Sequence, residues 1–158
     1  MPAQPPQNRG KLIALEGLDG VGKTTQARLL AHNLTHLGLP VILTREPTNG
    51  YFGQKIRQII IHGRHDLTPA AELELFIADR REHVQEVIQP ALAAGTIVIT
   101  DRYYFSSMAY QGALGLDPWD IQRRHEDFAP QPDLVIILEL PLVEIPSVSY
   151  FSESSIPH

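Results

Sequence analysis

The stretch EGLDGVGKTT, residues 16–25, constrains the fold more than any other part of the chain. It contains the pattern G-x-x-x-x-G-K-[ST], which ends in Lys23 and Thr24, and it lies between the apolar run LIAL and a helical pattern. Glycines let such a loop curl so that its N–H groups point at phosphate oxygens, and the following helix adds its positive end. A glycine-rich turn with a surface lysine would not explain this order. We therefore expect a strand, a phosphate-binding loop and a helix.

Apolar runs alternate with helix-period segments along the rest of the chain. We expect strands at residues 12–15, 41–44, 96–100 and 134–140. We expect helices at about 23–37, 51–62, 106–112 and from about 119, and a long one from 69 that is interrupted or ended near Pro90 and closed by Gly95. The strands are apolar throughout and do not alternate, which is typical of a buried parallel sheet. The predicted fold class is α/β, with a parallel sheet and helices on both faces.

Composition excludes several classes of protein. The formal net charge is −5 and no basic run is present, so a nucleic-acid partner is not expected. The sequence has no cysteine, which rules out disulfides and fits a cytoplasmic location. No apolar run reaches the ~20 residues that a membrane-spanning helix needs, so we expect no membrane segment.

The organisation of the chain is that of one domain with two flanking segments. Residues 1–10 are rich in Pro and Gln and are predicted to be a disordered leader. Residues 11–140 carry the alternating pattern of the domain. Residues 141–158 are rich in Ser and Pro without a sustained period, and they are predicted to be an irregular tail.

Four motifs follow one another in a characteristic order: EGLDGVGKTT, TREP at 44–47, FIADRREH at 76–83 and DRYYFSSMAYQG at 101–112. In order and spacing they resemble the thymidylate kinases, P-loop nucleoside monophosphate kinases, over roughly residues 11–140. The resemblance implies a P-loop NTPase-type sheet. It also implies transfer of the γ-phosphoryl group of ATP to dTMP, giving dTDP, with Mg²⁺ as cofactor.

On the ATP side, the motif predicts that Lys23 reaches the β/γ-phosphates and that Thr24 holds Mg²⁺. Asp101, after an apolar strand, is the second predicted metal residue, although it could simply cap a helix. Asp19 would repel phosphate, so it either forms a turn or contacts a hydroxyl of the second substrate or hydrated Mg²⁺. The full set of predicted ATP-binding residues is Gly17, Leu18, Asp19, Gly20, Val21, Gly22, Lys23, Thr24 and Thr25.

On the acceptor side, the resemblance implies that Arg102 clamps the dTMP phosphate, helped by Arg45. Phe76 and Arg80 are four residues apart on one helix face, where a ring and a guanidinium can stack on a base and bond its carbonyl edge. For Phe76 alone, core packing is the alternative. The full set of predicted dTMP-binding residues is Asp19, Arg45, Glu46, Phe76, Arg80, Arg102, Ser107, Tyr110 and Gln111.

Within this set, Ser107 and Gln111 are predicted at the thymine edge and Tyr110 at the 2′ position. The residues predicted to act in catalysis are Lys23, Asp101, Arg102 and Arg45. No nucleophile is expected, because phosphoryl transfer between bound nucleotides is mostly positioning and charge neutralisation. His83 is expected to be an ordinary helix-surface residue, and the alternative is an approach to the acceptor site, three residues past Arg80.

The resemblance breaks after residue 140. Family members continue with an arginine-bearing lid and a final strand and helix, and here no arginine follows Arg124. We therefore expect a C-terminally truncated fold with an exposed sheet edge. Two other functions stay open: a non-catalytic nucleotide-binding remnant, and a kinase for another pyrimidine nucleotide. The helices of the family's subunit interface are present, so a homodimer is expected.

Overall fold

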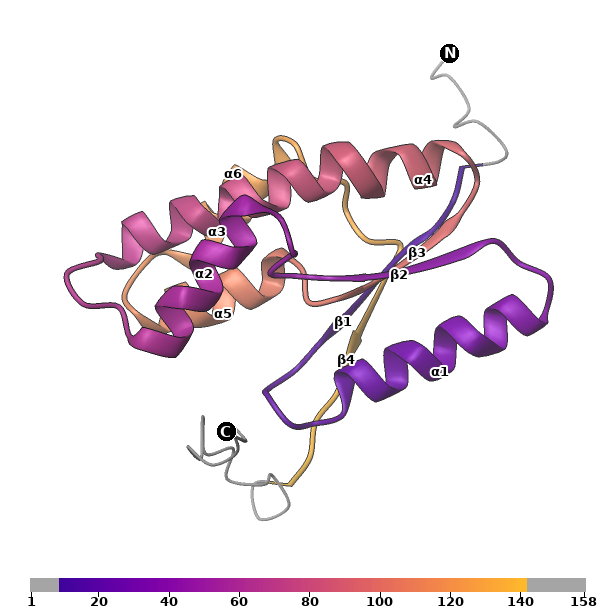
Figure 1. The fold of residues 1–158 in the computed structure, drawn as a ribbon, viewed down its shortest axis with the longest axis horizontal. Coiled ribbons are helices and arrows are strands. Elements are labelled where there is room, and N and C mark those ends of the chain that lie inside the picture. The colour runs from indigo at the N-terminus through magenta and orange to yellow at the C-terminus, as the bar shows by residue number, and fades with distance from the viewer. Residues whose placement is uncertain (1–8, 142–158) are drawn as a thin grey trace, which may run out of the picture.

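The computed structural model describes residues 9–141, and its centre is a four-stranded parallel sheet in the order β2-β3-β1-β4 (Figure 1). The strands are β1 (Leu12–Glu16), β2 (Val41–Arg45), β3 (Ile97–Asp101) and β4 (Leu134–Ile137). The helices are α1 (Lys23–His36), α2 (Tyr51–His62), α3 (Pro69–His83), α4 (Gln89–Ala93), α5 (Tyr104–Ala113), α6 (Pro118–Glu126) and the π-helical η1 (Val84–Ile88). The predicted α/β class with a parallel sheet is confirmed.

Helices cover both faces of the sheet, because alternate residues of the inner strands point to opposite sides. On one face, Leu12 and Ala14 pack in a cluster with Val84, Ile88 and Leu92 of the η1–α4 segment. On the other face, Leu15 and its neighbours pack against the apolar stripe of α1. The continuous helical rod formed by α3, η1 and α4 and the single helix α1 therefore lie on opposite sides of the sheet, as Figure 1 shows.

The long helix does not end at Pro90. Proline has no N–H and its ring clashes with the carbonyl of the preceding turn. The rod accommodates this by widening before the proline: η1 is π-helical, and the Gln89 N–H donates to the Val84 carbonyl, five residues back. The rod then continues as α4 to Ala93 and closes before Gly95, whose φ is 77°. Of the two predicted outcomes at Pro90, interruption is the one observed.

Most predicted elements lie within a residue or two of their observed bounds, with one exception. The fourth strand ends at Ile137 and not at Leu140. The fifth helix begins at Tyr104, before the predicted residue 106.

The predicted flanking segments fall mostly outside the described residues, which exclude 1–8 and 142–158. Gly10, which was predicted to belong to the leader, is buried, and its N–H donates to the Leu92 carbonyl at 2.8 Å. At the other end, β4 is an edge strand within the described sheet, and Leu134 and Ile137 are 50% and 67% exposed. Within residues 9–141, no helix has the length and apolarity needed to span a membrane.

We predict that Ile88→Ala lowers the free energy of unfolding by about 2–5 kcal/mol, because Ile88 is 0% exposed in the core between the rod and the sheet. Val87→Ala, at the preceding position, is the matched control. The Val87 side chain is 36% exposed, so its truncation is expected to cost less than about 1 kcal/mol. Equilibrium urea unfolding measures both. Equal losses in the two variants would contradict the assigned core.

Candidate functional site

The loop between β1 and α1 forms the base of the site. Gly22 caps α1 in a left-handed conformation, with φ of 95°, which favours glycine at this turn. Lys23 is buried against the loop, and its Nζ donates to the Leu18 carbonyl at 2.7 Å. Burial and the nearby Arg102 charge lower the pKa of Lys23. The lysine is therefore held over the loop, where it can exchange one carbonyl for a phosphate oxygen.

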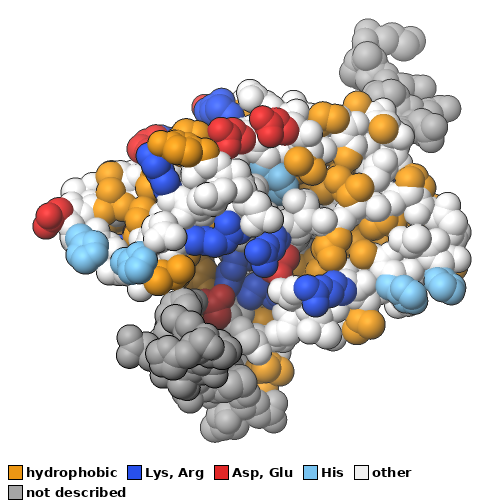
Figure 2. All heavy atoms as spheres, viewed as in Figure 1, with side chains coloured by type: hydrophobic (Ala, Val, Ile, Leu, Met, Phe, Trp, Pro, Cys, Tyr) orange, Lys and Arg blue, Asp and Glu red, His pale blue; other side chains and the backbone are white. Residues whose placement is uncertain are grey.

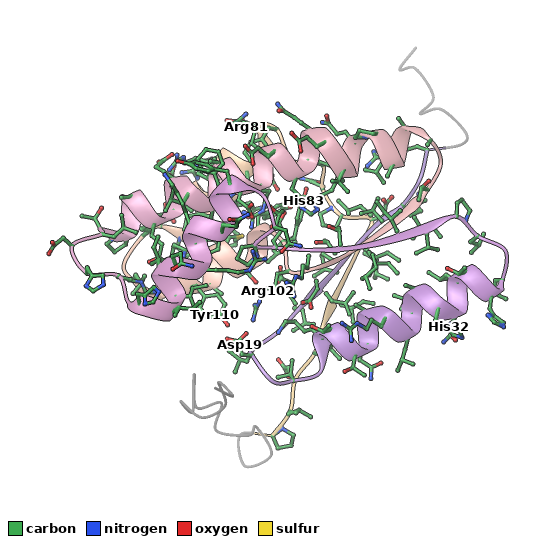
Figure 3. The ribbon with its side chains drawn as sticks, in the orientation of Figure 1. Asp19, His32, Arg81, His83, Arg102 and Tyr110 are labelled. Carbon is green, nitrogen blue, oxygen red and sulfur yellow. The ribbon has the colours of Figure 1, made fainter. Side chains whose placement is uncertain are left out.

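Arg102 projects over this loop from the end of β3. Its φ of 74° lies in the left-handed region. This conformation is uncommon for residues other than glycine and is often found at functional sites. Its guanidinium donates to Asp19 Oδ1 at 2.5 Å, to Ser106 Oγ at 2.9 Å and to the Gly17 carbonyl at 3.2 Å. Tyr110 lies beside it, with its ring centroid 5.3 Å from the guanidinium carbon. Figure 3 shows Asp19, Arg102 and Tyr110 converging from the loop, β3 and α5.

Glu16, at the end of β1, supports this arrangement from below. Its carboxylate accepts from the Tyr103 N–H at 2.8 Å and from Ser106 Oγ at 2.7 Å. Burial raises the pKa of Glu16, and the hydrogen bonds from Ser106 and Tyr103 oppose that rise. Glu16 thus fixes the serine that in turn accepts from Arg102.

A second cluster centres on the buried carboxylate of Glu46, directly after β2. Oε2 lies 2.7 Å from Arg80, and Oε1 lies 2.8 Å from His83 Nδ1. Burial by itself raises the pKa of Glu46, but the charge of Arg80 and the hydrogen bond from His83 hold it below its ordinary value. His83 also contacts Thr44 Oγ1 at 2.7 Å and is buried. The expectation that His83 lies on the helix surface was wrong, because His83 is buried and bonded to the buried Glu46 carboxylate.

His125 completes the partners of Arg80. Arg80 Nη1 donates to His125 Nε2 at 2.6 Å and to Ser107 Oγ at 3.2 Å, while His125 Nδ1 contacts the Ile121 carbonyl at 2.7 Å. This geometry requires a neutral imidazole that donates through Nδ1 and accepts through Nε2. Burial, and next the Arg80 charge, lower the pKa of His125 to about 4.

A cavity of about 900 Å³ lies beside these groups and is lined by residues of the phosphate loop and of α2, α3 and α5. Figure 2 shows Lys and Arg side chains gathered around the hollow at the centre of this face. Predicted residues that line the cavity are Asp19, Gly20, Gly22, Lys23, Thr24, Thr25, Arg45, Glu46, Phe76, Asp101, Arg102, Ser107, Tyr110 and Gln111. The sequence-based set is therefore brought together almost completely.

Four predicted residues do not line this cavity: Gly17, Leu18, Val21 and Arg80. Three of them belong to the phosphate loop, where Leu18 and Gly17 contribute the carbonyls bonded by Lys23 and Arg102. Arg80 is 1% exposed and lies behind the wall, with its donors directed to Glu46, Ser107 and His125. Its position favours support of the wall over direct contact with a base.

The inner end of the cavity carries a polar pair that the sequence did not indicate. Gln111 Nε2 donates to Glu72 Oε1 at 2.9 Å, and Arg64 Nε donates to Glu72 Oε2 at 2.5 Å. Among the described residues, Gln111 Oε1 is the buried side-chain atom without a hydrogen-bond partner. Such an atom is costly to leave unpaired, and it lies on a residue of the cavity wall.

Sequence reasoning missed Arg57, Arg64, Glu72 and His125 as residues of the site. Arg57 lines the cavity and donates to the Pro47 carbonyl at 2.6 Å. The burial of His125 had one available signal: it follows the apolar Ile121 by four residues, on the same face of α6. Glu72 offered no such signal, because an acidic residue in the first turn of a helix is common on surfaces.

The site suits a hard divalent cation. Thr24 Oγ1 and Asp101 Oδ2 lie 2.5 Å apart at the carboxyl end of the sheet, beside the phosphate loop. Hydroxyl and carboxylate oxygens are the ligands that Mg²⁺ takes in proteins, along with water and phosphate oxygens. Because Asp101 bonds the Thr24 hydroxyl, the simple helix-capping role for this aspartate is not needed to explain its position.

A comparison with protein families matches the thymidylate kinase model to residues 15–145. This chain belongs to the thymidylate kinase family. It is 56% identical over 135 residues to the thymidylate kinase of Desulfotalea psychrophila, an alignment that covers 85% of this chain and 66% of that protein. It is 48% identical over 132 residues to the thymidylate kinase of Brachyspira hyodysenteriae, covering 84% and 64%.

A solved structure supports the same assignment. The crystal structure of thymidylate kinase from Ehrlichia chaffeensis superposes with a TM-score of 0.74 at 37% identity, covering 83% of this chain and 72% of that chain. The P-loop NTPase-type architecture expected from the motifs is thereby confirmed. Against the thymidylate kinases of Desulfotalea, Brachyspira and Xanthomonas campestris, the aligned region of this chain spans 57–66% of the relative's length.

We predict a stability transition that depends on His125. Above its ordinary pKa of 6.5 the imidazole is neutral in both the folded and unfolded chain. As the pH falls from about 6.5 toward about 4, the unfolded chain takes up a proton that the folded chain excludes, so stability falls by up to about 3 kcal/mol. Below about pH 4 this contribution levels off.

Urea unfolding at several pH values checks this prediction. His125→Gln removes the titrating group, so the slope of stability against pH over that interval becomes shallower than in the wild type. His32→Gln, at an exposed position on α1, is the matched control. Identical slopes in the wild type and His125→Gln would show that His125 is not held neutral by the fold.

Proposed function

We propose that the thymidylate kinase family fold here binds ATP and dTMP and transfers the γ-phosphoryl group to dTMP, giving ADP and dTDP. The observation that carries this proposal is a single cavity with two chemically distinct sets of lining residues. Lys23 and Thr24 of the phosphate loop line it together with Phe76 and Gln111. Arg102 also lines it and is bonded to Asp19 of the loop. A donor nucleotide and an acceptor nucleotide can meet at that guanidinium.

On the donor side, backbone N–H groups of residues 17–25 cradle the ATP phosphates, and the positive end of α1 adds to the attraction. Lys23 gives up its bond to the Leu18 carbonyl and neutralises the β/γ-phosphates. Thr24 and Asp101 would hold Mg²⁺, which would supply positive charge beside the phosphates of the donor.

On the acceptor side, Arg102 and Arg45 clamp the phosphate of dTMP. Arg45 is exposed and lines the cavity, so its guanidinium is within the space that a ligand fills. Arg102 is already oriented by Asp19 and Ser106, which reduces the conformational entropy lost on binding. Phe76 stacks on the base, while Tyr110 stands where the sugar passes and disfavours a 2′-hydroxyl.

Arg80 acts from behind the wall in this proposal. It holds Ser107 and Glu46 in place, and Ser107 keeps its own proton for a ligand because it accepts from Arg80. Transfer then needs no covalent intermediate: the site aligns two phosphates and neutralises their charge.

A second candidate function is binding without turnover. The aligned region covers 57–66% of these relatives' lengths. Phosphoryl transfer depends on positioning and charge neutralisation, so a site that binds both nucleotides without aligning their phosphates turns over very slowly.

A homodimer, through helices that flank the sheet, is also proposed.

ADP release with MgATP and dTMP tests the proposed reaction, with no-acceptor and Lys23→Ala controls. Turnover that requires dTMP and is lost in Lys23→Ala supports the kinase. An absence of turnover together with dTMP binding supports the binding-only function. A folded chain that neither turns over nor binds dTMP would overturn both.

Arg102→Gln is expected to raise the Kd for dTMP roughly ten- to hundredfold, because charge-assisted bonds to a phosphate contribute about 1.5–3 kcal/mol. Arg81→Gln is the matched control. Arg81 is exposed on α3, stacks on Phe128 at 4.1 Å and faces away from the cavity, so its loss leaves the Kd unchanged. Isothermal titration calorimetry measures both variants, and equal effects would remove Arg102 from the acceptor clamp.

A further inference from the structure

We infer that Glu72, through Gln111, is the residue that makes this site select a base carrying an N–H at ring position 3. The inference deepens the proposed function and rests on it, since it assumes that a pyrimidine nucleotide is the acceptor. It assigns to Glu72 a positioning role: the carboxylate sets which end of the Gln111 amide meets the ligand.

The first step is the orientation of the amide. Gln111 Nε2 lies 2.9 Å from Glu72 Oε1, and a carboxylate can only accept hydrogen bonds. A half-turn of the amide about its terminal bond would place Gln111 Oε1 against the carboxylate oxygen of Glu72, and neither oxygen can donate a hydrogen bond. The amide therefore keeps its NH₂ group on Glu72 and presents Oε1 on the other side.

The second step is the fixation of Glu72 itself. Arg64 donates to Oε2 at 2.5 Å and to Oε1 at 3.4 Å, and the carboxylate is buried at the start of α3. A carboxylate paired with a guanidinium and an amide N–H has little freedom to turn away. Gln111 is therefore oriented before any ligand arrives.

The third step is the unmet demand of Oε1. The atom is buried, has no partner among residues 9–141, and belongs to a residue of the cavity wall. A ligand that donates a hydrogen bond there removes the cost of an unpaired acceptor, and a ligand that presents another acceptor increases that cost.

The fourth step identifies the base. Thymine and uracil carry one N–H on their hydrogen-bonding edge, at N3, between two carbonyl oxygens. A bound thymine can satisfy Oε1 only through that N3–H. Cytosine in the same pose places the N3 lone pair against Oε1, acceptor against acceptor. The Glu72–Gln111 pair thus favours dTMP and dUMP and rejects dCMP, and it does not distinguish the first two.

Calorimetric titration of dTMP, dUMP and dCMP into the full chain tests the inference without depending on turnover. The wild type is expected to bind dTMP and dUMP at least tenfold more tightly than dCMP. In Glu72→Gln the new amide can either accept or donate, so Gln111 can turn over. The ratio Kd(dCMP)/Kd(dTMP) is then expected to fall by about tenfold.

Glu74→Gln is the matched control: the same change two residues away on α3, at an exposed carboxylate that pairs with Arg124 on the surface. It is expected to leave the ratio unchanged. If Glu72→Gln does not fold, Gln111→Met replaces it, because methionine keeps the length and removes both amide groups. An unchanged ratio in the variant that folds overturns the inference.

The failure of the proposed function looks different. A folded wild type that binds none of the three nucleotides, or that binds dCMP most tightly, contradicts the acceptor assignment itself. A wild type that prefers dTMP, with a Glu72→Gln variant that prefers it equally, leaves the proposed function standing and removes Glu72 from it.

Discussion

The buried charge of Arg80 is the interaction on which the organisation of the site depends. A guanidinium that is 1% exposed must be compensated on every side, because an unpaired buried charge costs several kcal/mol. Its partners come from three other elements: Glu46 after β2, Ser107 on α5 and His125 on α6. Satisfying this one side chain from α3 therefore sets the mutual positions of the segments that form the cavity wall.

The parallel sheet supplies the second condition. Strands that run in the same direction end at the same edge, so Glu16, Arg45 and Asp101, although far apart in sequence, meet beside the phosphate loop. This edge of the sheet therefore carries both acidic and basic side chains close together. The result is a set of ion pairs and short hydrogen bonds in which Arg102 and Lys23 are already oriented when a ligand enters.

Much of the fold could be predicted because its signals are local. Apolar runs indicate buried strands, Gly22 permits the left-handed turn that starts α1, and the Thr68–Pro69 pair begins α3 with the hydroxyl accepting from the Ala71 N–H. The path of the helix through Pro90 was less predictable, since a proline without an N–H can be accommodated by a π-helical turn or can end the helix. In the structure the helix continues as α4, and Val84 and Ile88 pack in the core with Leu12 and Ala14 of the sheet.

The sequence by itself determined the phosphate loop, the α/β class, the family and most of the residues that line the cavity, because each depends on short spacing along the chain. Only the tertiary structure decided that Arg80 lies behind the wall, that His83 and His125 are buried, and that Gln111 presents an unpaired oxygen. The physical reason is that a polar side chain takes its role from its partners. Those of Gln111 and Arg80 are 27 to 45 residues away in sequence, and only folding brings them within hydrogen-bond distance.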